Sequence, residues 1–169
     1  MFILEKLEAN SRTFSAKATK EKLIRRVSFD FTGLPPTLAE IDDFINDKSL
    51  NAFEKVIDRL LETDAYAERM TADWLDLARY ADTHGYQNDF AREMWAWRDW
   101  VIHAFAKNMP YDEFVKYQIA GDLMPDPSLE QIIATGFNRN HKITFEGGVI
   151  DEEYRTEYVS DRAQTFGTA

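Results

Sequence analysis

The clearest helical pattern in this chain is NAFEKVIDRLL, residues 51–61. Its large apolar side chains recur at intervals of three and four positions, at Phe53, Val56, Ile57, Leu60 and Leu61. That spacing places them on one face of an α-helix, which needs an apolar partner to cover it. Asn51 just before the stripe is a residue type favoured at helix N-caps. We therefore predict an amphipathic helix here, packed against other helices.

Apolar stripes of the same period continue on both sides of this segment. Start and stop signals divide them: Thr37 and Glu40 form a capping-box pattern, and Gly33 before two prolines is typical of a helix end. Gly85 is expected to end the helix that begins at Asp64. Helices are predicted over residues 2–8, 20–32, 38–45, 52–61, 64–84, 93–108, 111–123 and 129–133, and from 151 onward.

Alternating strand patterns are almost absent, and only residues 142–145 fit an extended segment. The fold class is therefore all-α. We expect a single domain over residues 1–169, an irregular bundle of seven to nine helices with two long loops. The sequence also stops abruptly in FGTA, which is typical of a fragment from a longer multidomain protein.

Composition limits the possible partners. The chain has 30 acidic and 20 basic residues, a formal net charge of −10. This charge disfavours nucleic acid and anionic membrane surfaces as partners, and it suits a cation or a cationic protein. No cysteine is present, which excludes disulfides, zinc–thiolate sites and covalent haem attachment within the segment. The apolar runs are too short for a membrane span, and the first ten residues lack a signal-peptide pattern.

The first candidate site is the polar stretch RYADTHGYQND, residues 79–89. Asp82 and His84 lie two positions apart, a spacing that a turn can bring together. A carboxylate beside an imidazole is the pairing used in general acid–base catalysis, so both are candidate catalytic residues. The alternative is that Asp82 braces the loop while His84 is simply exposed.

The second candidate site is NRNHKITFEGGVIDEEYR, residues 138–155. Asn140 and His141 are candidate cofactor-binding residues. Glu146 precedes two glycines, whose backbones can approach a ligand closely, and is a candidate catalytic residue. A glycine turn that needs no ligand is the alternative interpretation.

The last predicted helix has an unusual acidic face. Glu153, Glu157 and Asp161 recur every four residues, and like charges at that spacing repel one another. A bound divalent cation, calcium or magnesium from the oxygen-rich ligand set, would offset this repulsion, as would Arg155 and Arg162. Glu153 is also a candidate catalytic residue, and Arg155 a candidate cofactor-binding residue. The alternative is a solvated acidic face.

Standard catalytic signatures are missing from the chain. The sequence has no G-x-S-x-G elbow, no P-loop, no G-x-G-x-x-G and no H-E-x-x-H motif. The tryptophans could suggest a platform for sugars, but their helical spacing is more typical of core packing. The sequence therefore indicates where a site would lie rather than which reaction it performs.

Five long motifs resemble one known family. They are LIRRVSFDFTGLPP (23–36), RYADTHGYQ (79–87), WRDWVI (97–102), QIAGDLMPDPSLEQIIATGFNRN (118–140) and EGGVIDEEYRTEYVSDR (146–162). The chain resembles the planctomycete-type cytochrome-c-associated domain of unknown function over nearly its whole length. That resemblance implies an exported, periplasmic bacterial protein of several domains, found in the context of polysaccharide degradation.

The resemblance also implies neighbours for this segment. Family members often carry a cytochrome c domain before it, and a C-x-x-C-H segment usually follows the stretch matched here by residues 161–168. A c-type haem is then expected in the full-length protein and no cofactor in this segment. The family supplies no catalytic residue that can be transferred to this chain.

Three hypotheses follow. In the first, a helical module helps to form a redox or substrate pocket beside a c-type haem. Asp82, Glu146 and Glu153 supply polar groups there, and Arg155 holds a carboxylate or a haem propionate. In the second, a carbohydrate-active enzyme domain uses two of these carboxylates as an acid–base pair. In the third, the domain is a structural or partner-binding module. The expected partners are other domains of the same polypeptide, an electron-transfer protein or a glycan.

Overall fold

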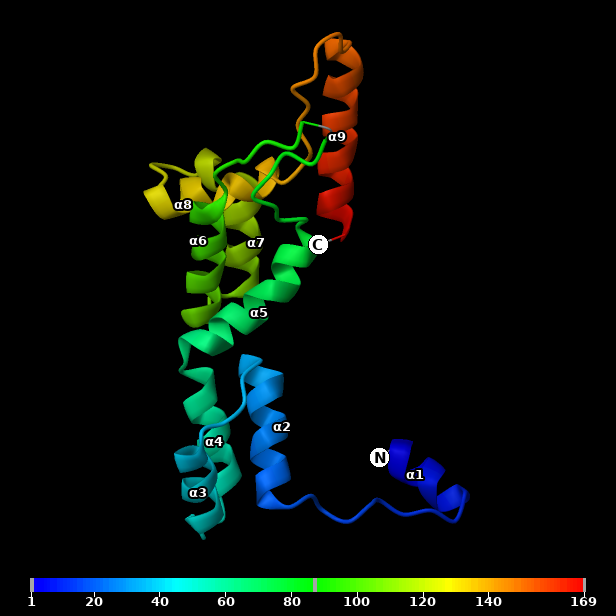
Figure 1. Ribbon diagram of the computed structural model, residues 1–169, viewed down its shortest axis with the longest axis vertical. Coiled ribbons are helices and arrows are strands. Elements are labelled where there is room, and N and C mark those ends of the chain that lie inside the picture. The colour runs from blue at the N-terminus through cyan, green and yellow to red at the C-terminus, as the bar shows by residue number, and fades with distance from the viewer. Residues whose placement is uncertain (1, 87, 169) are drawn as a thin grey trace.

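The computed structural model describes residues 2–86 and 88–168, and within them it is all-α, as predicted (Figure 1). Gln87 of the first polar stretch lies outside the described residues. The α-helices are α1 (Phe2–Ala9), α2 (Lys20–Thr32), α3 (Leu38–Asn46), α4 (Ala52–Leu61), α5 (Asp64–Leu77), α6 (Trp95–Ala106), α7 (Tyr111–Ala120), α8 (Leu129–Ala134) and α9 (Asp151–Thr168). Two short 3₁₀ helices, η1 (Gly121–Leu123) and η2 (Thr135–Arg139), flank α8. None of the described helices is long and apolar enough to cross a membrane.

The helices gather around two apolar clusters joined by α5 (Figure 1). One cluster lies between α2, α3 and α4 and contains Ile24, Phe44 and Val56. The other lies between α5, α6, α7 and α8, with Trp97 and Phe114 near its centre. Helix α5 contacts α2 and α4 on one side and α6 on the other. Helix α5 packs against the second cluster and also contacts α2 and α4, so the two clusters belong to a continuous helical body.

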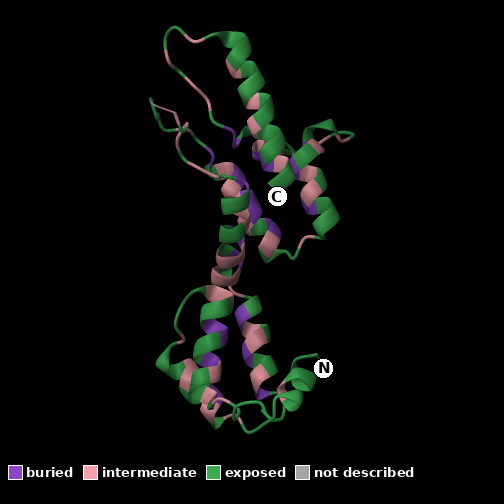
Figure 2. Cartoon of the chain, turned by 90° about the vertical axis from the view of Figure 1, so that its right-hand side faces the viewer, coloured by how far each residue is buried: buried purple, intermediate pink, exposed green. Residues whose placement is uncertain are grey.

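Two elements lie outside these clusters. Helix α1 has no buried residue and stands apart from the body, at the end of an extended, exposed connection (Figure 1). Helix α9 has 18 residues, of which only Thr165 is buried, and Figure 2 shows most of its length exposed. Helix α9 is thus attached to the body through a small part of its surface.

The predicted capping box at Thr37 and the helix end at Gly33 are confirmed, whereas Asn51 stands at the N-cap of α4 without a side-chain cap hydrogen bond. The Thr37 hydroxyl accepts from the Glu40 backbone N–H, and the Glu40 carboxylate accepts from the Thr37 N–H. Ser128 and Gln131 form the same reciprocal pair at α8. Gly33 ends α2 with a φ of 68°, in the left-handed region that glycine adopts easily.

The predicted end of α5 at Gly85 is wrong. The helix ends at Leu77, because Arg79 adopts the left-handed conformation with a φ of 57°. The Tyr80 N–H then donates to the Leu75 carbonyl at 2.9 Å, and the Arg79 N–H donates to the Asp76 carbonyl at 3.1 Å. These two bonds form a Schellman motif with arginine in the place usually taken by glycine. The residues between Ala78 and the start of α6 at Trp95 therefore form a loop rather than an extension of α5.

We expect Lys20 to stabilise the packing of α2 on α3, at the apolar cluster that these two helices form with α4. Its ammonium group donates to the carbonyls of Phe44 and Asp47 at the C-terminal end of α3, at 2.8 and 2.5 Å, and lies 4.9 Å from the centre of the Phe44 ring. A cation at a helix C-terminus satisfies free carbonyls and complements the helix dipole. We expect Lys20→Met to lower the free energy of unfolding by about 1–2 kcal/mol in urea denaturation.

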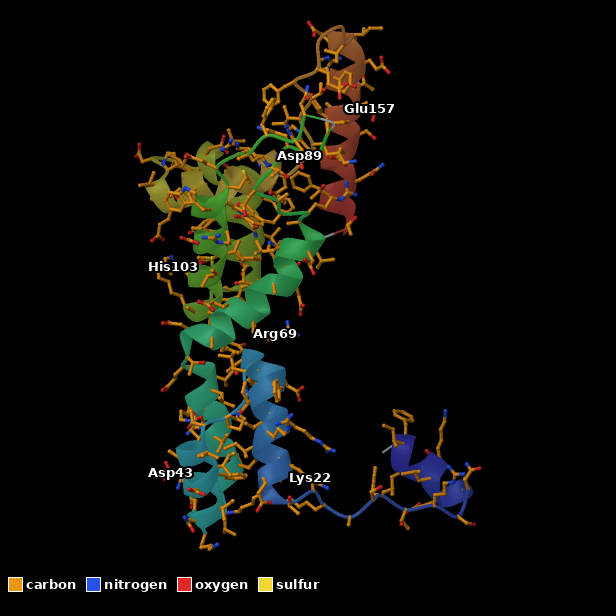
Figure 3. The ribbon with its side chains drawn as sticks, viewed as in Figure 1. Lys22, Asp43, Arg69, Asp89, His103 and Glu157 are labelled. Atoms are coloured by element: carbon orange, nitrogen blue, oxygen red, sulfur yellow. The ribbon has the colours of Figure 1, made fainter. Side chains whose placement is uncertain are left out.

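Lys22 is the matched control because it lies on the same helix and is exposed (Figure 3). Lys22→Met should change the unfolding free energy by less than about 0.5 kcal/mol. Equal effects of the two substitutions would contradict the capping role of Lys20.

Candidate functional site

The two polar stretches meet in space. We call residues 78–94, between α5 and α6, the first loop, and residues 140–150, between η2 and α9, the second loop. The Ile143 N–H of the second loop donates to the His84 carbonyl of the first loop at 3.1 Å. The His84 N–H in turn donates to the Phe90 carbonyl, also at 3.1 Å. Figure 1 shows both loops running beside α9.

Arg92 binds the two loops together. Its guanidinium donates to the carbonyls of Arg139 and His141 at 3.0 and 2.9 Å, and to that of Ala81 at 3.3 Å. Its own backbone N–H donates to the Asp82 carbonyl at 2.8 Å. Burial at this junction lowers the pKa of Arg92, and the charge of Arg139 acts in the same direction, whereas the carboxylates of Asp82 and Asp89 oppose the shift. Sequence reasoning missed this residue, because nothing in its spacing distinguishes it from a surface arginine.

Three residues of α9 hold the helix on this junction through polar contacts. The Asp161 carboxylate accepts from the Lys142 N–H at 3.1 Å and pairs with Arg79. The Tyr158 hydroxyl accepts from the Thr144 N–H at 2.8 Å. Arg162 contacts the ring of His141. Figure 3 shows Asp89 of the first loop and Glu157 of α9 at the same end of the molecule.

The two candidate cofactor-binding residues of the second loop are both buried. His141 has 9% of its surface exposed, and its ring packs against Tyr158 with centroids 5.1 Å apart. Asn140 is 4% exposed, and neither its amide oxygen nor its amide nitrogen has a hydrogen-bond partner among the described residues. A buried amide without partners is costly, which makes Asn140 the least satisfied group of the junction.

Asp82 and His84, the two candidate catalytic residues of the first loop, contact different partners. The Tyr80 hydroxyl donates to Asp82 at 2.6 Å, and burial together with this carboxylate raises the pKa of Tyr80 to about 12. His84 packs its ring edge against Phe145 of the second loop, with centroids 4.6 Å apart. Within the described residues no hydrogen bond joins Asp82 to His84. The loop is instead braced by Asp89, which accepts from the Gly85 N–H at 2.6 Å; this bond lowers the pKa of the Asp89 carboxyl.

The remaining acidic candidates lie on or beside α9. Glu146 is half-buried, and its backbone N–H donates to the Thr144 hydroxyl at 3.3 Å. Glu153 and Glu157 are exposed, whereas Asp161 is held by Arg79 and Lys142. In the described part of the chain, no group of three histidine, aspartate or glutamate side chains is arranged to hold a metal ion. A cation at Asp161 would have to compete with Arg79 for its carboxylate.

A family model matches the whole chain, residues 1–169. The chain belongs to the PSCyt2 family. The family is described as "Protein of unknown function (DUF1549)", so membership assigns no activity. The resemblance seen in the sequence is thereby confirmed as membership of a family of unknown function. No curated protein and no solved structure matches the chain.

The residues of this PSCyt2 chain do not fit a haem-holding role within the segment itself. It lacks the cysteines that a c-type haem needs for attachment. Arg155, the candidate for a propionate, is exposed and already donates to Glu152 at 2.9 and 2.5 Å. A haem would have to be carried elsewhere and to meet this chain from outside. The junction is suited to fixing loop and helix positions, and the exposed side of α9 to making contacts.

Proposed function

We propose that this chain is a helical docking module of an exported, haem-linked multidomain protein. The surface of α9 with the first and second loops would receive a neighbouring domain that carries a c-type haem. The observation that carries the proposal is that α9 is ordered over 18 residues although only Thr165 is buried. Helices in proteins gain most of their stability from packing against other elements. Because α9 has so little cover, we expect a further partner on its open face.

Apolar side chains on the same elements support this surface. Phe90, Phe145, Ile150 and Val159 are all more than half exposed, and the rings of Phe90 and Phe145 lie 6.3 Å apart. Exposed apolar side chains beside polar ones are typical of interaction surfaces. The contact would therefore combine apolar burial with a polar rim.

The charge of α9 indicates the charge of its partner. Helix α9 carries five acidic residues (151, 152, 153, 157 and 161) and two basic ones (155 and 162). Such a helix favours a partner whose contacting face is positive, and it speeds their encounter at low salt. Asp82, Glu146 and Glu153 would place carboxylates around the contact, near enough to influence a haem in the partner. The carbohydrate-active alternative stays a prediction, since no contact among the described residues pairs Asp82 with Glu146 or Glu153.

The proposal can be tested by titrating the chain with a cytochrome c domain from a protein of this family. We expect binding that weakens as salt rises and that falls about tenfold or more in the double variant Ile150→Ser, Val159→Ser. Calorimetry gives the affinity, and the haem absorbance of the partner reports whether the contact reaches its haem.

Leu38 and Leu129 provide the control, because they are 81% and 72% exposed on α3 and α8, away from α9. The double variant Leu38→Ser, Leu129→Ser should bind like the wild type. Absence of binding, or equal losses in the two double variants, would refute the proposed surface.

A further inference from the structure

We propose that His141 is a proton-operated latch, which holds α9 on the two loops while its ring is neutral and releases the helix when the ring is protonated. The latch works within this chain and does not depend on what α9 meets outside it. Its parts are the imidazole of His141, the Lys142 carbonyl and the guanidinium of Arg162.

The partners of the ring fix where its proton lies. Nδ1 is 2.8 Å from the Lys142 carbonyl oxygen, and Nε2 is 3.0 Å from Nη2 of Arg162. A carbonyl oxygen can only accept, so Nδ1 carries the hydrogen. A guanidinium can only donate, so Nε2 must offer its lone pair. The geometry therefore requires the neutral tautomer with hydrogen on Nδ1.

Protonation removes this acceptor. A hydrogen on Nε2 would point at the N–H of Arg162, and the hydrogen bond would be replaced by two positive charges at contact distance. The ring cannot escape easily into water, because it is 9% exposed and packed against Tyr158. The repulsion is relieved when the exposed Arg162 side chain leaves the ring, and this removes one of the contacts that hold α9, the helix that carries both Arg162 and Tyr158.

The other charged groups at this junction do not compensate. On α9, Asp161 is the nearest carboxylate in the sequence to Arg162, but Arg79 and the Lys142 N–H already occupy it. On the loops, Arg92 donates to the His141 carbonyl and Lys142 adds a further positive charge. The titratable and charged groups around the ring are Arg79, Arg92, Lys142, Tyr158, Asp161 and Arg162. Four of these six are cationic, and Asp161 is the one carboxylate among them.

Apart from the His141 contact, α9 is held by Asp161, which pairs with Arg79 and accepts from the Lys142 N–H, and by few buried contacts. Of the 18 residues of α9 only Thr165 is buried, and Phe166 packs against Phe137 with centroids 5.1 Å apart. The N-terminal half of the helix is held by Tyr158 and the aromatic contact between Tyr86 and Tyr154. Segments with few buried contacts open at low free-energy cost, so the loss of one charge-assisted bond is enough to change their opening equilibrium.

The test is amide hydrogen exchange of the chain between pH about 8 and about 5, the interval over which imidazole side chains change charge. After correction for intrinsic exchange rates, we expect residues 151–160 to exchange about tenfold faster at the lower pH. His141→Gln offers a neutral acceptor and donor at the same place, and it should make their exchange independent of pH. His103→Gln is the control, because His103 lies exposed on α6, on the side away from α9 (Figure 3), and this variant should keep the acid response.

A second measurement stays valid if the His141 variant does not fold. Nitrogen NMR of the wild-type ring should show hydrogen on Nδ1 at the higher pH and on both nitrogens once α9 is released. The latch is overturned if residues 151–160 show no acid response, if the response persists in His141→Gln, or if the neutral ring carries its hydrogen on Nε2.

Discussion

Gly121→Ala is expected to cost about 3 kcal/mol of unfolding free energy or more, the largest effect among the glycine-to-alanine substitutions of this chain. Gly121 begins η1 and is buried against α8. A Cβ atom built there would lie 2.1 Å from the Gln131 carbonyl oxygen and 2.9 Å from its carbon. These are backbone atoms of a helix, so the clash can be relieved only by moving α8 away from α7. Urea denaturation followed by circular dichroism measures the loss.

Gly167→Ala is the matched control, because a Cβ atom at Gly167 would meet nothing within 4 Å. Gly167 lies in α9, where alanine is the better helix former by about 0.5–1 kcal/mol. We therefore expect this variant to be as stable as the wild type or slightly more so. Wild-type stability in Gly121→Ala would contradict the close packing of η1 on α8.

Arg92→Met is expected to separate the first and second loops. The substitution leaves the carbonyls of Arg139 and His141 without their charged donor in a partly buried place. Hydrogen bonds to charged groups contribute more than neutral ones, so we expect a loss of about 2–3 kcal/mol. Hydrogen exchange should show the loss first in residues 139–146, because most of the carbonyls that this guanidinium binds belong to residues 139–141.

Two further arginine variants test whether the effect is specific to the guanidinium of Arg92. Arg92→Lys should recover only part of the loss, since one ammonium group cannot reach several diverging carbonyls as a planar guanidinium does. Arg98→Met removes a half-buried arginine that pairs with the neighbouring Asp99 on the same helix, so we expect a change below about 0.5 kcal/mol. If Arg98→Met loosens residues 139–146 as much as Arg92→Met does, the role given to Arg92 is wrong.

Much of the fold could be predicted from residue pattern because helices and caps are local. The capping boxes at Thr37 and Ser128 and the glycine end at Gly33 depend on residues within one turn of each other. The end of α5 was mispredicted because Arg79 is not a residue type that normally adopts a left-handed conformation. Residue pattern could not show that α5 would contact both α2 and α6, because that is a property of the tertiary packing.

Residue pattern predicts that the two polar stretches meet, but it does not predict the contacts that hold them together. The meeting of the two loops agrees with the expectation that polar, glycine-bearing stretches gather between helices. The contacts that hold them could not be foreseen, because Arg92 and its carbonyl acceptors are almost fifty residues apart in the sequence. His141 was singled out as a cofactor-binding candidate, but its partners are Lys142 and Arg162. The acidic face of α9 was recognised, whereas its pairing with Arg79 at the far end of α5 was not.

The backbone and the side chain of Arg79 have different roles. Its backbone bends the chain out of α5, where glycine would serve at lower conformational cost. Its side chain reaches across to Asp161, which glycine could not do. The strain of a left-handed arginine is therefore compensated by an attachment between distant helices. Arg79 thus couples the end of α5 to the attachment of α9, and we expect a substitution at this one position to affect both.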